Sequence, residues 1–85
     1  MTRHYNIIVK GKVQGVAFRF SAHHKAIKLG LTGLVKNMPD RSVFIEAEGT
    51  EEDINKLIEW CYYGPPKEKV TEVNAIEGEV KGYKT

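Results

Sequence analysis

The feature that most constrains the fold is the spacing of its apolar residues. Along this short chain, segments in which an apolar residue recurs every two positions alternate with segments in which it recurs about every 3.6 positions. Over residues 4–10 apolar and polar side chains alternate, which predicts a β-strand. Over residues 18–29 an apolar residue recurs every three or four positions, which predicts a helix. Gly30 follows directly and is typical of a helix end, because glycine adopts the left-handed conformation at little cost. Between strand and helix lies a loop, residues 11–17, that contains two glycines.

The middle of the chain predicts a hairpin. Alternation over residues 31–37 and again over residues 42–48 gives two strands, which a turn at residues 38–41 connects. Glu46 and Glu48 alternate with the apolar residues of the second of these strands. We therefore expect both carboxylates to face solvent or the open surface of a sheet.

A second helix and a last strand complete the pattern. The sequence TEED at residues 50–53 is a helix-capping pattern, and GPP at residues 64–66 ends the helix that it opens. One face of this helix carries an apolar stripe: Ile54, Leu57, Ile58 and Cys61. Residues 70–77 read as a strand, and Val80 and Tyr83 would allow a short edge strand in the tail.

The order of elements is therefore β-α-β-β-α-β. Right-handed crossovers convert this order into a ferredoxin-like α+β sandwich, an antiparallel sheet with two helices on one face. Eighty-five residues suffice for one small domain, so we expect a single domain over residues 1–85. Many unrelated functions use this fold, and the order of elements by itself indicates none of them.

Composition excludes several classes of protein. Cys61 is the one cysteine, so neither a disulfide framework nor a zinc site built on thiolates can form within the chain. No apolar run reaches the ~18 residues of a membrane span, and the N-terminus does not resemble a signal peptide. A net charge of +2 is too small to predict nucleic-acid binding. We expect a cytoplasmic monomer that binds neither nucleic acid nor membrane.

The loop at residues 11–17 is the strongest candidate for chemistry. Gly11 and Gly15 would let successive N–H groups point inward as an anion-binding nest, and the loop leads into a helix N-terminus. Arg19 lies in the first helical turn, where a cation opposes the helix dipole unless an anion binds there. The spacing is not that of a nucleotide P-loop. From the motif alone, a tight turn with an exposed Arg19 remains an equal alternative.

The longer motifs carry more information than the glycines. The segment GKVQGVAFR at residues 11–19, followed by LGLTGLVKN at residues 29–37, closely resembles the acylphosphatase family over nearly the whole chain. The resemblance implies a hydrolase that needs no metal or cofactor and splits acyl phosphates into a carboxylate and inorganic phosphate. It implies that Arg19 binds the phosphoryl group and that Asn37 positions the attacking water. It also implies a phosphate cradle made by the backbone N–H groups of Gln14, Gly15, Val16, Ala17 and Phe18.

The sequence departs from the family pattern in the predicted hairpin. The family often has tryptophan where this chain has Leu34, and usually has glycine where this chain has Arg41. Because glycine allows a positive φ, Arg41 predicts a different or strained turn a few residues from Asn37. Two histidines on the first helix, His23 and His24, are adjacent and point in different directions, so we expect them at the surface.

Two other functions remain as alternatives. One is a non-catalytic domain of acylphosphatase type that binds phosphate or a partner protein, although the retention of both Arg19 and Asn37 favours activity. The other is RNA binding, because RNA-recognition modules share this element order. Phe44 is a lone aromatic on its strand and shares a face with Glu46 and Glu48, which would repel a phosphate backbone. We therefore expect small-molecule acyl phosphates and inorganic phosphate as the ligands.

Overall fold

The computed structural model describes residues 1–12, 16–63 and 69–83. The six elements occur in the predicted order: β1 (Arg3–Lys12), α1 (Val16–Lys28), β2 (Thr32–Asn37), β3 (Val43–Gly49), α2 (Glu51–Tyr63) and β4 (Lys69–Gly78). Two boundaries differ from the prediction, because β1 continues to Lys12 and α1 begins at Val16. The glycine-containing loop is therefore shorter than expected. Gln14, Gly15 and the GPP segment at 64–66 lie outside the described residues.

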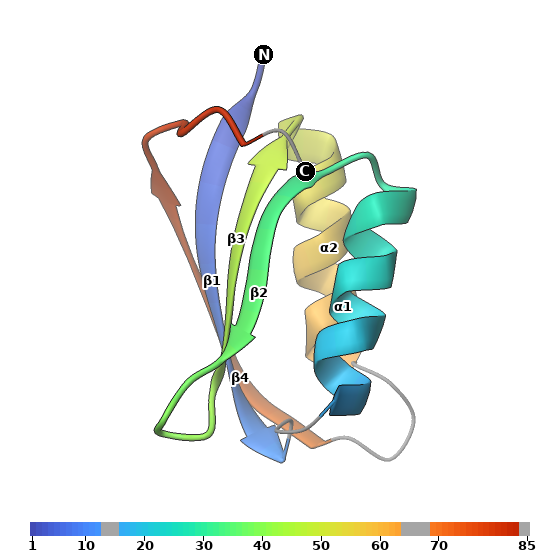
Figure 1. Ribbon diagram of the computed structural model, residues 1–85, viewed down its shortest axis with the longest axis vertical. Coiled ribbons are helices and arrows are strands. Elements are labelled where there is room, and N and C mark those ends of the chain that lie inside the picture. Colours follow the sequence, from blue (N-terminus) through green and yellow to red (C-terminus); the bar gives the residue numbers. More distant parts are fainter. Residues whose placement is uncertain (13–15, 64–68, 84–85) are drawn as a thin grey trace.

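The four strands form one antiparallel sheet in the order β2-β3-β1-β4, so β1 and β3 are central and β2 and β4 are edges. Both helices cover the same face of this sheet (Figure 1). The predicted ferredoxin-like sandwich is confirmed. The direction of each element places the end of β1, the start of α1 and the end of β2 at one end of the molecule (Figure 1).

The core lies between the sheet and the two helices. Every second residue of β1 and β3 points into it, as the alternation predicted, and the helices contribute their apolar stripes. Cys61 is fully buried, and burial raises the pKa of its thiol to about 12, which makes it a small core residue rather than a reactive group. The buried hydrophobic residues are Ile7, Val9, Phe18, Ala22, Leu31, Val43, Ile45, Ala47, Ile54, Leu57 and Cys61.

Local signals in the sequence set the helix ends. The backbone N–H of Asp53 donates to Oγ1 of Thr50 at 3.2 Å, which is the predicted cap of α2. At the end of α1, Gly30 adopts φ +73, and its N–H donates to the carbonyl of Ile27 at 3.0 Å. The N–H of Leu31 donates to the carbonyl of Ala26 at 2.9 Å, so the two bonds form a Schellman motif. This cap turns the chain directly from α1 into β2.

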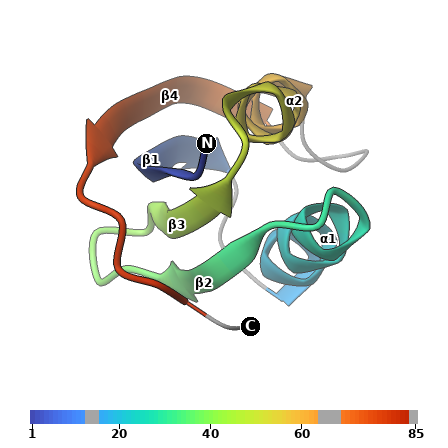
Figure 2. The same cartoon turned by 90° about the horizontal axis from the view of Figure 1, so that it is seen from above.

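The tail differs from the prediction of an edge strand. Residues 79–83, here called the C-terminal strap, form no strand, and they cross the face of the sheet away from the helices, from β4 towards β2 (Figure 2). The prediction was wrong because Gly82 has φ +76, which breaks an extended conformation. Glu46 and Glu48 lie on that open face as expected, but they are buried rather than exposed.

Candidate phosphate site at the start of helix α1

The first turn of α1 offers backbone donors and no negative charge. Val16, Ala17 and Phe18 are its first three residues, and N–H groups at these positions have no partner within the helix. The turn contains no acidic residue to neutralise the positive end of the helix dipole. Three of the five predicted cradle residues therefore occupy an anion-attracting position, and the other two, Gln14 and Gly15, are outside the described part of the chain.

Arg19 follows on the same turn and is half-buried, not fully exposed as the tight-turn alternative requires. Its guanidinium carbon lies 5.9 Å from the centre of the Phe20 ring, a cation–π distance. Arg19 lines a pocket of about 220 Å³ with Phe20 and His23 of α1 and Val35 of β2. The structure therefore brings the predicted phosphate-binding arginine next to the strand that ends in Asn37.

Asn37 is the last residue of β2 and pairs with Val43 of β3. Val43 belongs to the core, and Val35 two residues earlier packs against it, so Asn37 faces the helix side of the sheet. Its Oδ1 is buried and accepts no hydrogen bond from any residue in the described ranges. An unpaired buried acceptor costs about 1–3 kcal/mol, and such atoms are commonly satisfied by a water molecule or a ligand.

Two residues with positive φ shape β2 and the turn that follows it. Gly33 has φ +140, and a Cβ there would lie 1.8 Å from the carbonyl oxygen of Glu46, so only glycine fits this register. In the following turn Arg41 adopts φ +74, which confirms the strained conformation expected there. The turn is closed by the N–H of Met38, which donates to the carbonyl of Ser42 at 2.8 Å. The carboxylate of Asp40 accepts from the hydroxyl of Ser42 at 2.5 Å and from its N–H at 3.0 Å, and these two bonds lower the pKa of Asp40.

Sequence reasoning missed Phe20 and Val35 as walls of the pocket beside Arg19. A usable signal was present at Phe20, because a large aromatic residue directly after the arginine cannot share the core face of α1 with Phe18. No comparable signal existed for Val35, which read as an ordinary core residue of an edge strand. His23 is exposed, as expected, yet it lines the same pocket.

A second polar cluster lies on the face of the sheet away from the helices, and sequence reasoning missed it. His4 of β1 is buried together with Glu46 and Glu48 of β3. Glu48 accepts a hydrogen bond from Nδ1 of His4 at 2.7 Å, and a carboxylate oxygen of Glu46 lies 3.3 Å from Nε2. The same Nε2 lies 2.8 Å from Oδ1 of Asn6. We call these four side chains the buried polar cluster.

The C-terminal strap covers the buried polar cluster. The N–H groups of Lys81, Gly82 and Tyr83 all donate to the Glu48 carboxylate, the last two at 2.9 and 3.0 Å. Burial alone would raise the pKa of Glu48, but these N–H groups and the histidine ring outweigh it and lower the pKa to about 2. The ammonium group of Lys81 lies 2.7 Å from Glu46 and lowers the pKa of that carboxyl. Glu48 thus stays ionised although it is buried.

No group of three or more His, Cys, Asp or Glu side chains within residues 1–12, 16–63 and 69–83 is arranged to hold a metal ion. Among those same residues, no helix is long and apolar enough to cross a membrane. Metal-independent chemistry and a cytoplasmic location stay predictions.

The family model described as Acylphosphatase matches residues 5–85 of this chain. The chain belongs to the acylphosphatase family. An acylphosphatase of Methylococcus capsulatus is 47% identical over 77 residues, which are 91% of this chain and 84% of that protein. The solved structure of an acylphosphatase from Coxiella burnetii superposes with a TM-score of 0.93 at 42% identity, and the match covers 98% of this chain and 87% of that one.

The same acylphosphatase fold also occurs inside a much longer protein. The crystal structure of full-length HypF matches with a TM-score of 0.91 at 36% identity, covering 99% of this chain but only 11% of the HypF chain. The fold of this family therefore occurs both in chains of about this length and as a small part of a longer chain.

Proposed function

We propose that this protein is an acylphosphatase that hydrolyses the carboxyl–phosphate bond of small acyl phosphates to a carboxylate and inorganic phosphate. The observation that carries the proposal is the buried Oδ1 of Asn37, which has no hydrogen-bond partner in the described part of the chain and shares one end of the fold with Arg19 and the start of α1. A phosphate binder needs donors and positive charge but no free acceptor. An acceptor without a partner beside such donors is what the positioning of a water molecule requires.

The proposed roles follow from the charge of the reaction. The guanidinium of Arg19 offers a planar fork of donors to the phosphoryl oxygens, and the free N–H groups of the first α1 turn add further donors. Phosphoryl transfer depends mainly on positioning and on stabilising the charge that spreads over the equatorial oxygens. Arg19 and the backbone donors meet that need without a covalent intermediate.

Asn37 is a positioning group for the attacking water. Its side-chain Oδ1 accepts a hydrogen bond from the water, so that the water oxygen faces phosphorus in line with the leaving carboxylate oxygen. The new bond joins the water oxygen to phosphorus, the bond between phosphorus and the acyl oxygen breaks, and the water proton passes to the phosphate product. Asn37 does not deprotonate the water, because an amide is a very weak base. The reaction proceeds without a strong base because a carboxylate is a good leaving group.

We extend the proposal to a cytoplasmic, monomeric enzyme whose ligands are the acyl phosphate and inorganic phosphate, without nucleic acid. The alternative, a non-catalytic domain that binds phosphate or a partner, draws support from the match to a small part of HypF. The two differ in one measurable property. A binding domain holds inorganic phosphate without turnover, whereas the enzyme releases phosphate continuously from an acyl phosphate.

The test is hydrolysis of benzoyl phosphate by the purified chain with EDTA present. We expect metal-independent turnover that falls by about 100–1000-fold in Arg19→Gln, because one preorganised donor contributes roughly that factor. Arg3→Gln is the matched control, since Arg3 forms exposed ion pairs with Glu51 and Glu77. Full activity in folded Arg19→Gln would refute the role of Arg19, and no turnover by the folded wild type would favour the binding domain.

A further inference from the structure

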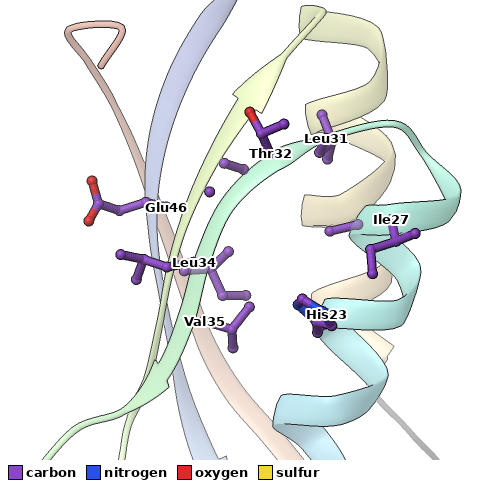
Figure 3. A pocket seen from close by; sticks show the side chains of 11 residues that line it. His23, Ile27, Leu31, Thr32, Leu34, Val35 and Glu46 are labelled. Carbon is purple, nitrogen blue, oxygen red and sulfur yellow. The ribbon is translucent and has the colours of Figure 1, made fainter. Parts of the chain in front are cut away.

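A groove between α1 and the edge strand β2 leads away from Arg19. The pocket beside Arg19 shares two of its walls, His23 and Val35, with a second hollow of about 40 Å³ farther along the same seam. In that second hollow Val35, Ile27 and His23 lie on the helix side of β2 (Figure 3). The two hollows adjoin at His23 and Val35, and we call them together the groove between α1 and β2.

The walls of the groove are mainly apolar. Phe20 and Val35 line its mouth, and the continuation adds mainly apolar side chains from α1 and from the chain that leads into β2: Ala26, Ile27, Leu31. Glu46 also lines the second hollow through its strand, but its carboxylate points to the opposite face of the sheet (Figure 3). Apart from Arg19, His23 is the only other lining side chain in the described residues that can carry positive charge.

We propose that this groove binds the acyl group of the substrate and that Phe20 and Val35 select apolar, above all aromatic, acyl groups. The inference rests on the proposed function, because it assumes that Arg19 holds the phosphoryl group. With the phosphorus atom beside Arg19, the acyl carbon is separated from it by one bridging anhydride oxygen. The pocket lined by Arg19, Phe20 and Val35 then offers the acyl group an adjacent apolar surface.

The size and exposure of the walls fit this assignment. The pocket at Arg19 is open to solvent and has a volume of about 220 Å³, which leaves room for a ring that an enclosed cavity of about 150 Å³ can already hold. The Phe20 side chain is 63% exposed, so its ring has apolar surface that a bound acyl group would cover. An acyl group with a second carboxylate would meet mostly apolar walls, because the phosphoryl group already engages Arg19.

The test is the ratio of kcat/KM for benzoyl phosphate to kcat/KM for acetyl phosphate. We expect Phe20→Ala to lower this ratio by about five- to tenfold relative to wild type, the range expected when apolar surface is lost from a specificity pocket. Phe20 also contacts Arg19, and any resulting shift of the guanidinium slows both substrates alike. That common effect cancels in the ratio, so the ratio reports the acyl group alone.

Tyr62→Ala is the matched control, because Tyr62 is an exposed aromatic residue of α2 that lines neither hollow. Phe20→Leu keeps an apolar wall without the ring and should lower the ratio less than Phe20→Ala. An unchanged ratio in folded Phe20→Ala, with acetyl phosphate still hydrolysed, would overturn the acyl-site assignment and leave the proposed function intact. If wild type hydrolyses neither substrate, the proposed function itself fails.

Discussion

The buried polar cluster and the site at the start of α1 differ in where their hydrogen-bond partners come from. In the cluster, Glu48 receives donors from His4 and from three N–H groups of the C-terminal strap. At the site, Oδ1 of Asn37 accepts none from the described residues, and the first turn of α1 carries no acidic partner. Asn37 and Glu48 lie on neighbouring strands of the same sheet. The backbone fold therefore does not explain why one side chain has partners and the other has none among the described residues.

The comparison teaches how to separate structural from functional polar groups in a small domain. A cluster whose groups satisfy one another stabilises the native state and leaves nothing for a ligand. A site whose buried acceptor lacks a partner costs stability and keeps that capacity for a water or a substrate. Changes in the two regions should therefore affect different measurable quantities.

The largest effect that tests the comparison is expected at Asn37. Asn37→Ala should lower kcat for benzoyl phosphate by about 100-fold with a much smaller change in KM, because water positioning acts on the chemical step. The free energy of unfolding should not fall and should rise by up to about 1 kcal/mol, since the variant removes a buried acceptor that has no partner among the described residues. Asn55→Ala, on the exposed face of α2, is the control. An equal loss of stability and activity would show that Asn37 is structural.

The opposite result is expected in the buried polar cluster. Glu48→Gln should lower the free energy of unfolding by about 2 kcal/mol, because the variant places a neutral amide beneath three N–H donors and next to His4. The kcat should stay within about twofold of wild type. Urea unfolding measures the free energy of unfolding of this variant, and Glu59→Gln, at an exposed position of α2, is the control. A large loss of kcat in a variant of full stability would show that Glu48 contributes to catalysis and would contradict the separation of the two regions.

Acid should weaken the cluster before it affects the core. The pKa of Glu48 is lowered from 4.5 to about 2, so its stabilising contribution is complete above the unfolded pKa and is lost as pH falls towards about 2. In urea titrations between about pH 6 and pH 2, the stability difference between wild type and Glu48→Gln should shrink as pH falls. A constant difference across that window would mean that the carboxylate charge contributes nothing.

The smallest effects concern two residues with positive φ, one in each region. Arg41, in the turn after Asn37, has φ +74, and Gly82, in the C-terminal strap, has φ +76 with open space where a Cβ would lie. Arg41→Gly should raise the free energy of unfolding by about 1 kcal/mol, and Gly82→Ala should lower it by about the same amount. Thermal unfolding of both variants measures this. Shifts of the same sign would contradict the backbone explanation.

The fold was predictable because the apolar periodicities, the Thr50 cap and the Gly30 stop agree with one another. Arg19 and Asn37 were predicted through a family resemblance, and periodicity alone would have assigned them to a helix turn and a strand end. The acyl groove was not predictable, since it depends on how closely α1 packs against β2. Glu48 was misread because strand alternation gives the face of a side chain but not what later crosses that face.

The C-terminal strap also bears on how long the native state lasts. Glu48 binds His4 across 44 residues of chain and the strap across 33, 34 and 35 residues, so these bonds form only after distant segments have met. Contacts of this kind are commonly absent from the folding transition state, and their loss then accelerates unfolding while leaving the refolding rate unchanged. We expect the strap to slow unfolding. The lifetime of the folded enzyme then depends on five residues that lie on the opposite face of the sheet from the helices.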